Sequence, residues 1–219
     1  MYLILLGLPG AGKGTQAALI SRERSMAHIT SGGLFRENIS RGTELGVRVK
    51  PFYDQGLLAP NEITIGMILE RIAQPDAAGG FILDGFPRNV EQARALDEAL
   101  AGEGKAIDRA IYIRVSEEEL VRRLAGRWNC SRCGAIYHEQ SSPPAKAGVC
   151  DQCGSKLSQR DDDRPEVVRT RLQVNLKELD PLLDHYRNLD RLSEVDGERD
   201  ADTVRDDLLS VIGRAQGVR

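Results

Sequence analysis

The sequence has no excess of positive charge, few aromatic residues and no long apolar run, and these shortages argue against several classes of protein. Its formal net charge is −3, so no basic field is available to attract the phosphates of a nucleic acid. No stretch approaches the roughly 20 apolar residues that a membrane-spanning helix needs. No charged region precedes the first apolar run and no small-residue cleavage site follows it, so we expect no signal peptide and a cytoplasmic location.

Cysteine is also scarce, but its four copies form one pattern. They stand as Cys130-x-x-Cys133 and Cys150-x-x-Cys153, each pair is followed by glycine, and 16 residues separate the pairs. Two such turns can place four thiolates around Zn²⁺, and a closed set of four ligands indicates a structural role. Disulfides are the alternative, which the expected reducing compartment disfavours, and a redox pair would need a thioredoxin-like context. We call residues 127–163 the cysteine segment.

A glycine-rich loop stands at the start of the chain. The residues GLPGAGKGT (7–15) follow the apolar run Tyr2–Leu6 and precede a helix-forming stretch at Gln16–Ser21. In such a turn the backbone N–H groups can point inward around anionic oxygens, and the helix N-terminus adds partial positive charge. Lys13 can then reach the β- and γ-phosphates. The loop predicts that the chain binds a nucleoside triphosphate.

One position in the loop departs from the general GxxxxGK[S/T] pattern. Gly14 stands where a hydroxyl usually helps to hold Mg²⁺, and the hydroxyl comes one residue later, at Thr15. We therefore expect the nucleotide phosphates to bind the magnesium ion, which keeps most of its water ligands, as this small ion prefers.

Apolar runs of strand length alternate with helical stretches. Several runs are continuously apolar, as in strands that are buried on both faces. With the loop, this alternation predicts an α/β fold: a P-loop NTPase-like, parallel five-stranded sheet flanked by helices. The expected strands are Tyr2–Leu6, Ala27–Ile29, Phe81–Leu83, Ala110–Val115 and Leu192–Val195, and helices are expected over Asn89–Leu100, Glu117–Leu124 and Glu166–Tyr186.

Two regions interrupt the alternation and are expected to be insertions into the core. Residues 30–59, which we call the insert, are polar with short helical patterns, and Gly42, Gly46 and Gly56 are expected to form turns. The other is the cysteine segment, which has no long periodic run. The core domain would then comprise residues 1–29, 60–126 and 164–219.

Four segments together resemble the adenylate kinase family: GLPGAGKGT, SGGLFR (31–36), LDGFPR (83–88) and RDDD (160–163). The resemblance extends over essentially the whole chain, and the cysteines are similar to those of the bacterial members that carry zinc in a lid. It implies a core that holds phosphates, a small nucleoside-monophosphate-binding insert and a zinc-ribbon lid that closes over ATP. It also implies ATP, AMP and ADP as substrates, with Mg²⁺ accompanying ATP and Zn²⁺ in the lid.

The resemblance also implies roles for individual residues. Asp84 would orient magnesium-bound water, and catalysis would rest on Asp84, Lys13, Arg88, Arg127, Arg160 and Arg171. ATP would contact Gly10, Ala11, Gly12, Lys13, Gly14, Thr15, Arg123, Arg127, Ile136, Tyr137 and Arg199. AMP would contact Ser31, Arg36, Leu57, Leu58, Ala59, Gly85, Phe86, Pro87, Arg88, Gln92, Arg160 and Arg171.

Two positions depart from the family pattern. Ser31 replaces the usual threonine and keeps its hydroxyl, whereas Gly33 replaces a common aspartate and removes a carboxylate near the metal waters. Asp162 and Asp163 are read either as a solvated run of charge or as partners of the lid arginines.

The implied chemistry agrees with the residue types present. An ionised phosphate needs no general base to attack another phosphate, so the reaction calls for a lysine, a metal and several arginines. A kinase for another nucleoside monophosphate is the nearest alternative, which Gln92 and the long lid disfavour. A nucleic-acid-binding zinc ribbon is the alternative from another class, and the acidic balance disfavours it. Nothing in the sequence demands a partner chain, so we expect a monomer.

Overall fold

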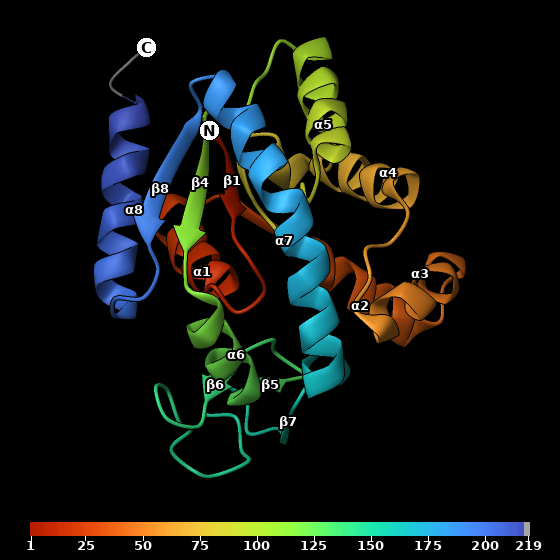
Figure 1. The fold of residues 1–219 in the computed structure, drawn as a ribbon, viewed down its shortest axis with the longest axis vertical. Coiled ribbons are helices and arrows are strands. Elements are labelled where there is room, and N and C mark those ends of the chain that lie inside the picture. The colour runs from red at the N-terminus through yellow and green to blue at the C-terminus, as the bar shows by residue number, and fades with distance from the viewer. Residues whose placement is uncertain (217–219) are drawn as a thin grey trace.

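A parallel five-stranded sheet forms the middle of the protein in the computed structural model, which describes residues 1–216 (Figure 1). The strand order is β2-β3-β1-β4-β8, and every neighbouring pair is parallel. The predicted α/β, P-loop NTPase-like sheet is therefore confirmed. All five apolar runs form its strands: β1 (Tyr2–Leu6), β2 (Ala27–Thr30), β3 (Phe81–Asp84), β4 (Arg109–Arg114) and β8 (Leu192–Asp196).

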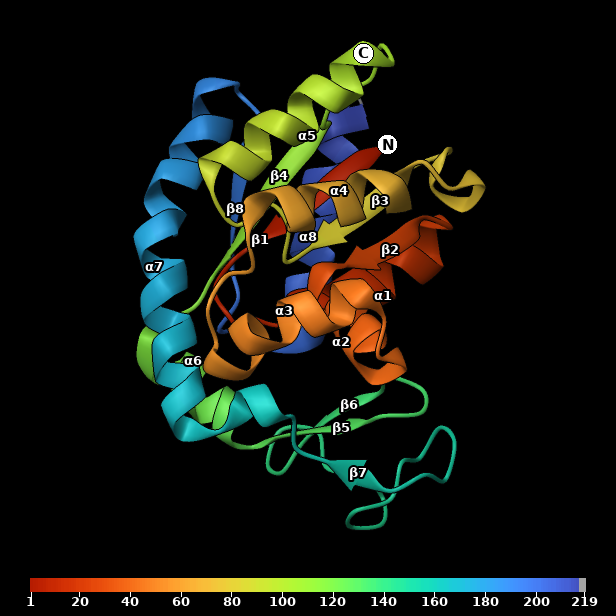
Figure 2. The same ribbon diagram turned by 90° about the vertical axis from the view of Figure 1, so that its right-hand side faces the viewer.

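The central strands are buried because helices cover both faces of the sheet (Figures 1 and 2). Leu3, Ile4 and Leu5 of β1 are at most 1% exposed, which explains why this strand lacks apolar–polar alternation. Helices α1 (Lys13–Arg24) and α8 (Ala201–Gln216) pack together on one face. The other face carries α4 (Asn61–Ile72), α5 (Val90–Gly102) and α7 (Pro165–Asn188), and α6 (Glu117–Ala125) contacts α7.

The insert folds as two short antiparallel helices, α2 (Ser31–Arg41) and α3 (Glu44–Gln55). Thr30 and Thr43 cap their N-termini by accepting hydrogen bonds from Gly33 N–H and Gly46 N–H. Gly42 and Gly56 end the two helices, with φ of 62° and 72°, so the turns predicted at these two glycines are confirmed.

The turn predicted at Gly46 is wrong, because Gly46 lies in the first turns of α3. A Cβ atom at this position would approach the backbone oxygen of Asn38 to 2.2 Å. The glycine is therefore required by the close contact between α2 and α3. A local pattern cannot reveal this requirement, since the contacting atom belongs to another helix.

The cysteine segment forms a separate small sheet with the strand order β6-β5-β7. Its strands are β5 (Arg127–Cys130), β6 (Ile136–His138) and β7 (Leu157–Ser158), and two 3₁₀ turns, η1 (Pro75–Ala77) and η2 (Asp161–Asp163), complete the elements. In Figure 1 the arrowheads of β4 and β8 point toward this segment, so it lies beyond the carboxyl ends of the strands. Ligands of open α/β sheets bind at that edge.

Within residues 1–216 we find no helix that combines the length and the apolar character needed to cross a bilayer.

Candidate active site

The glycine loop leaves β1 at Gly7 and enters α1 at Lys13. Gly10 and Gly12 have φ of 91° and 89°, a conformation in which a side chain is strained. Lys13 Nζ donates hydrogen bonds to the backbone oxygens of Gly7 (2.7 Å) and Leu8 (2.9 Å). The ammonium group is thus held over the loop, next to the N-terminus of α1, where anionic oxygens are favoured.

Asp84, at the end of β3, faces this loop from the neighbouring strand. A Cβ atom on Gly14 would lie 3.2 Å from Asp84 Oδ2, so a side chain at position 14 would crowd the carboxylate. This contact explains why glycine replaces the usual hydroxyl residue. Thr15, which carries the hydroxyl, is exposed on α1.

Lys13 and Asp84 are both partly buried, and each affects the pKa of the other. Burial lowers the pKa of Lys13 to about 8, although the charge of Asp84 opposes this shift. Burial also raises the pKa of Asp84, but the neighbouring His28, with Nε2 at 3.7 Å, and Lys13 outweigh it and hold that pKa below its ordinary value. Asp84 is therefore an ionised carboxylate at neutral pH, an oxygen donor of the kind that a hydrated magnesium ion accepts.

The residues that follow Asp84 turn the chain toward the insert. Gly85 has φ of 75°, and the Phe86–Pro87 peptide bond is cis. The backbone oxygen of Gly85 accepts hydrogen bonds from Ser31 Oγ (2.6 Å) and Arg88 Nε (2.8 Å). Burial and the charge of Arg171 lower the pKa of Arg88 to about 10, which leaves its guanidinium positive at neutral pH.

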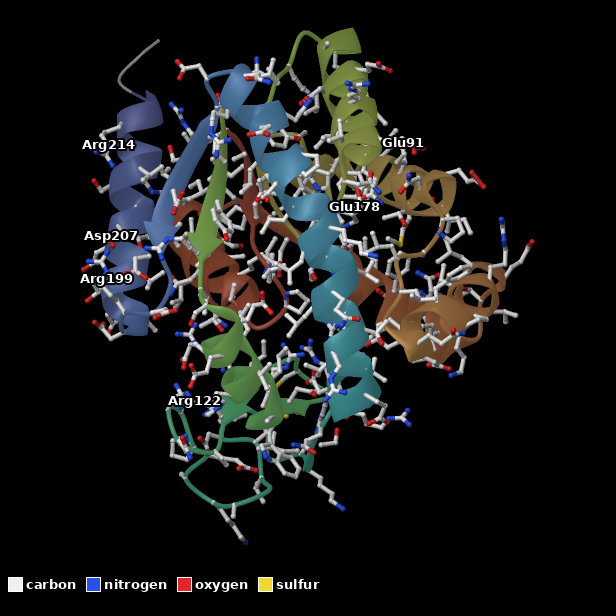
Figure 3. The ribbon with its side chains drawn as sticks, viewed as in Figure 1. Glu91, Arg122, Glu178, Arg199, Asp207 and Arg214 are labelled. Atoms are coloured by element: carbon white, nitrogen blue, oxygen red, sulfur yellow. The ribbon has the colours of Figure 1, made fainter. Side chains whose placement is uncertain are left out.

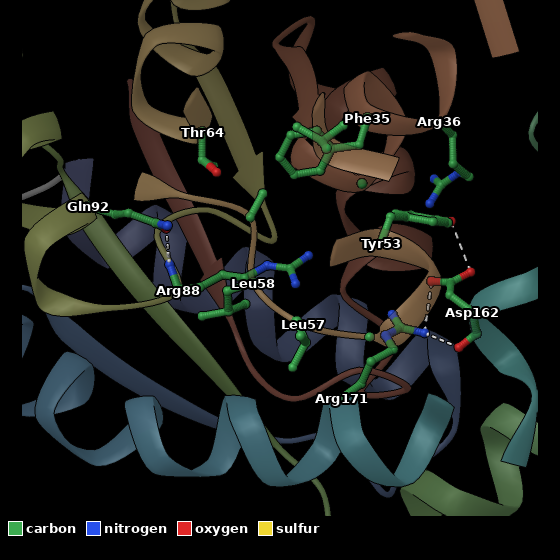
Figure 4. A pocket seen from close by; sticks show the side chains of 14 residues that line it. Phe35, Arg36, Tyr53, Leu57, Leu58, Thr64, Arg88, Gln92, Asp162 and Arg171 are labelled. Atoms are coloured by element: carbon green, nitrogen blue, oxygen red, sulfur yellow. Dashed lines mark hydrogen bonds and ion pairs between the residues drawn. The ribbon is translucent and has the colours of Figure 1, made fainter. Parts of the chain in front are cut away.

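A cavity of about 600 Å³, its open mouth included, lies between the insert, the end of β3 and α7 (Figure 4). Three cations, Arg36, Arg88 and Arg171, line one part of it. Gln92 and Thr64 lie in another part, where Gln92 Nε2 donates to Asn61 Oδ1 at 2.9 Å and Gln92 Oε1 accepts from Arg88 N–H at 2.8 Å. The remaining wall is largely apolar and includes Phe35, Val49, Leu57, Leu58 and Ala59. The cationic part has the charge that attracts a phosphate, and the apolar part has the character of a surface that receives a base.

Two aspartates bind the arginines at the root of the cysteine segment. Arg127 Nε donates to Asp163 Oδ2 at 2.8 Å. Arg171 Nη1 lies 2.9 Å from Asp162 Oδ2 and 3.3 Å from Asp163 Oδ1. Asp162 and Asp163 are only 3% and 7% exposed. The interpretation of these aspartates as a solvated run of charge is therefore wrong. The predicted pairing with a lid arginine is confirmed for Asp163, which binds Arg127, whereas Asp162 pairs with Arg171 of α7.

Arg160 lies in the same cluster. Its Nε is buried and has no hydrogen-bond partner among the described residues. Burial and the charges of Arg36 and Arg127 lower its pKa to about 10. Like charges at this density are stabilised by an anion, so the cluster is suited to bind phosphates.

The remaining residues predicted to bind ATP lie at different distances from the loop. Ile136 Cδ1 is 3.9 Å from the position of a Cβ atom on Gly14, so β6 lies over the loop. Arg123 is held at the end of α6, where Nε donates to Glu119 Oε1 and Nη2 to the backbone oxygen of Gly197. Arg199 forms an ion pair with Asp207 on the outer side of α8, and it is about half exposed (Figure 3).

The four cysteines come together as their spacing predicts. All four Sγ atoms lie within 4.8 Å of one another, and no disulfide joins them. A tetrahedral zinc ion with Zn–S distances of about 2.3 Å separates its sulfurs by about 3.8 Å, so the group has a suitable size for a metal. Pairs of sulfurs 3.4 and 3.5 Å apart (Cys130–Cys153 and Cys133–Cys150) are consistent with such a site.

Tyr137 lies against this group and does not point toward the glycine loop. Its hydroxyl accepts a hydrogen bond from Asp151 N–H (2.8 Å) and lies 3.5 Å from Cys150 Sγ. A hydrogen bond from Tyr137 lowers the pKa of the Cys150 thiol, which favours the thiolate that binds metal. Any contact of Tyr137 with ATP would thus come from its backbone.

Comparison with known proteins accounts for this arrangement. The family model described as adenylate kinase matches residues 5–191. The adenylate kinase of Oceanobacillus iheyensis is 50% identical over 212 residues, which cover 97% of this chain and 99% of that protein. The adenylate kinase of Lachnoclostridium phytofermentans is 48% identical, over 98% of this chain and 99% of that protein.

The chain belongs to the adenylate kinase family. It is accordingly a nucleoside monophosphate kinase, a phosphotransferase with nucleotide substrates. The resemblance inferred from the four motifs is confirmed, and the cysteine cluster supports its metal-lid subtype.

Seven residues that line the cavity belong to none of the residues assigned by resemblance: Gly32, Phe35, Val49, Tyr53, Gly56, Thr64 and Asp162. Val49 and Tyr53 are four residues apart on α3 and so share one helix face. That spacing is a usable signal, but it identifies the inner face only once the position of α3 is known.

Proposed function

We propose that the chain catalyses the reversible, magnesium-dependent reaction ATP + AMP ⇌ 2 ADP. One observation carries the proposal. The last residue of β3, Asp84, faces the glycine loop. Four residues further along the chain, Arg88 lines the cavity that contains the arginines. A triphosphate on the loop and a monophosphate in the cavity would therefore meet end to end at one strand terminus.

The chain's own residues would act by position and charge. The attacking phosphate of AMP is already ionised, so none of these groups needs to remove a proton. Lys13 and Arg88 would hold the facing phosphates in line, while Arg127, Arg160 and Arg171 would stabilise charge on the transferred group. Arginine suits this role because its planar fork binds two phosphate oxygens and remains protonated.

The binding roles implied by the resemblance form part of this proposal. For ATP they involve the loop from Gly10 to Thr15, with Arg123, Arg127, Ile136, Tyr137 and Arg199. For AMP they involve Ser31, Arg36, the stretch Leu57–Ala59 and the stretch from Gly85 to Arg88, with Gln92, Arg160 and Arg171. Gln92 would read the adenine edge, since its amide can both donate and accept.

Asp84 is the residue that fits a magnesium site. It is ionised and lies beside the loop, and the small residue at position 14 leaves space next to it. Magnesium would supply charge neutralisation on the phosphates and would keep most of its waters. Asp84 would orient those waters without direct help from a carboxylate at position 33, where this chain has glycine.

We further propose three functional parts: a core (1–29, 60–126 and 164–219), the insert as the AMP-binding part and the cysteine segment as a lid. Zinc bound by Cys130, Cys133, Cys150 and Cys153 would stabilise the lid without taking part in the reaction. Closure would exclude water and bring Arg127 and Arg160 to the phosphates, a motion for which adenylate kinase is itself a standard example. Lid opening would then limit turnover.

ADP formation from ATP and magnesium, measured in a coupled assay with AMP present or omitted, tests the reaction. We expect ADP only when both nucleotides are present, and no ADP under that condition would refute the proposal. UMP and CMP added as competitors test the base, and UMP outcompeting AMP would reassign the acceptor. We also propose a cytoplasmic monomer that binds neither nucleic acid nor membrane, which light scattering and a salt-dependent gel shift would check.

A further inference from the structure

Tyr53 connects the insert to the root of the cysteine segment. It lies on α3 in the wall of the cavity, and its hydroxyl donates to Asp162 Oδ1 at 3.0 Å (Figure 4). Asp162 belongs to η2, which leads from the cysteine segment into α7. This is a side-chain contact between residues 109 positions apart in the sequence.

The Asp162 carboxylate uses both of its oxygens. Oδ1 accepts the hydrogen bond from Tyr53, and Oδ2 pairs with Arg171 Nη1 at 2.9 Å. Arg171 also donates to the backbone oxygen of Asp162 at 2.8 Å. Because the Asp162 side chain is only 4% exposed, little water can replace either partner.

Arg36 lines the same cavity as Tyr53, and its positive charge opposes the upward shift that burial and Asp162 impose on the pKa of Tyr53. Tyr53 therefore shares the cavity with one arginine and donates to the carboxylate that holds another, Arg171.

A neutral hydroxyl has an advantage over a carboxylate in a cavity that Arg36 also lines. It can orient the guanidinium without cancelling the charge that a phosphate would need. Fixing the cations before a ligand arrives also reduces the entropy lost on binding. The cations also repel one another: after burial, the charge of a neighbouring arginine is the next cause that lowers the pKa of Arg88 and of Arg160.

We propose that Tyr53 and Asp162 form a positioning pair that preorganises Arg36 and Arg171 to receive the phosphate of AMP. This inference rests on the proposed function and assigns Tyr53 a role in it. Tyr53 is a positioning residue, since it acts through the two arginines. The pair supports the recognition of the phosphate by these arginines and has no part in recognition of the base.

The test compares the binding of AMP and adenosine to the full chain by calorimetry. Tyr53→Phe removes only the hydroxyl, and Tyr2→Phe is the matched control, because the Tyr2 hydroxyl is exposed and contacts Ala78 O at 3.3 Å outside the site. Loss of a hydrogen bond to a buried charged group predicts AMP binding weakened about tenfold in Tyr53→Phe. Adenosine binding should change by less than about twofold, since adenosine lacks the phosphate.

A kinetic measurement tests the same role independently. In Tyr53→Phe the KM for AMP should rise about tenfold, while kcat and the KM for ATP stay within about twofold of the parent. In an Asp162→Ala background, Tyr53→Phe should weaken AMP binding little further, because the two residues act as one unit.

The outcomes separate the inference from the function beneath it. Equal weakening of AMP and adenosine would show a structural role for Tyr53 and overturn the inference. Unchanged or tighter AMP binding would also overturn it, and tighter binding would mean that the pair holds the arginines away from the phosphate. If the parent protein binds AMP no better than adenosine, the proposed AMP site itself fails, whatever the variant does.

Discussion

The glycine loop and the cysteine segment are both proposed to bind ions, phosphates in the loop and a metal in the segment, but different forces hold them in position. The loop follows β1, whose residues Leu3 to Leu6 are at most 3% exposed within a large apolar core. The cysteine segment has its own small cluster of four buried residues, and two of them, Cys130 and Cys150, belong to the proposed metal site. We therefore expect the loop to keep its shape without its ligand and the segment to depend on the proposed metal for much of its stability.

Because of this difference, we expect the loop region to govern catalysis and the cysteine segment to govern stability. Lys13, Asp84 and Arg88 are partly buried charges beside a core that consists of apolar residues. The cysteines contribute no charge to the reacting phosphates, but they connect turns that few apolar contacts join. A substitution in the first region should therefore change rates, and one in the second should change melting.

Lys13→Ala tests the catalytic side and should have the largest effect. Removal of the ammonium should lower kcat by about 10³-fold or more, the scale of a lost transition-state charge. The melting curve should stay close to that of the parent, because the substitution leaves the apolar core unchanged. Lys177→Ala, at an exposed position on α7, is the matched control. A near-normal kcat in Lys13→Ala would remove the role given to this residue.

Cys150→Ala tests the other side of the comparison. Removing one thiolate from a set of four should abolish metal binding, measured by metal analysis of the purified protein, and lower the unfolding temperature by several degrees. Much of the activity should persist at low temperature, where the segment can still close. If the parent protein melts at one temperature with and without a chelator, the metal does not stabilise the segment.

Tyr137→Phe refines the same comparison with a smaller change. The lost hydroxyl supports Cys150 from outside the set of ligands, and such losses weaken metal affinity by about tenfold. A competition titration with a metal-binding dye measures the change. The catalytic rate with the metal bound should be unaffected, and a large fall in kcat would show that Tyr137 contributes to the ATP site with its side chain.

The smallest expected effect is the dependence of kcat/KM for ATP on pH. It tests whether the positive charge of Lys13 contributes to ATP binding. Lys13 faces Asp84, Arg88, Arg127 and Arg171, and its pKa is lowered to about 8. The group is cationic below that pH and neutral above it, so kcat/KM for ATP should fall about threefold between about pH 7.5 and about pH 8.5. Bound phosphate raises the pKa of Lys13, so kcat at saturating ATP should fall less. Equal profiles for the two parameters would contradict the assignment.

Much of the architecture was predictable because local patterns decide it. Strands buried on both faces must be continuously apolar, so Tyr2–Leu6 and Phe81–Leu83 could be recognised without any contact information. The positive φ angles of Gly42 and Gly56 follow from their places at helix ends. The paired Cys-x-x-Cys turns are similarly local, since each turn presents its two sulfurs together.

The errors and omissions all concern contacts between separate elements. The sequence predicts a turn at Gly46, but the need for glycine there comes from Asn38 on the preceding helix. The burial of Asp162 and Asp163 depends on the arrival of α3 and α7. Tyr53 belongs to no sequence motif. Only the packing of the insert against η2, at the end of the cysteine segment, brings its hydroxyl to Asp162.

The sequence by itself determined the parallel sheet, the phosphate-binding loop and the grouping of the cysteines, because each depends on residues that are neighbours along the chain or repeat with a regular period. Only the tertiary structure decided which charges are buried together. The free energy of a buried charge depends on every group around it, and here those groups come from β3, the insert, η2 and α7. The arginines could be assigned by resemblance to a family. The residues proposed to position them could be found only in the folded protein, because their contacts come from several elements.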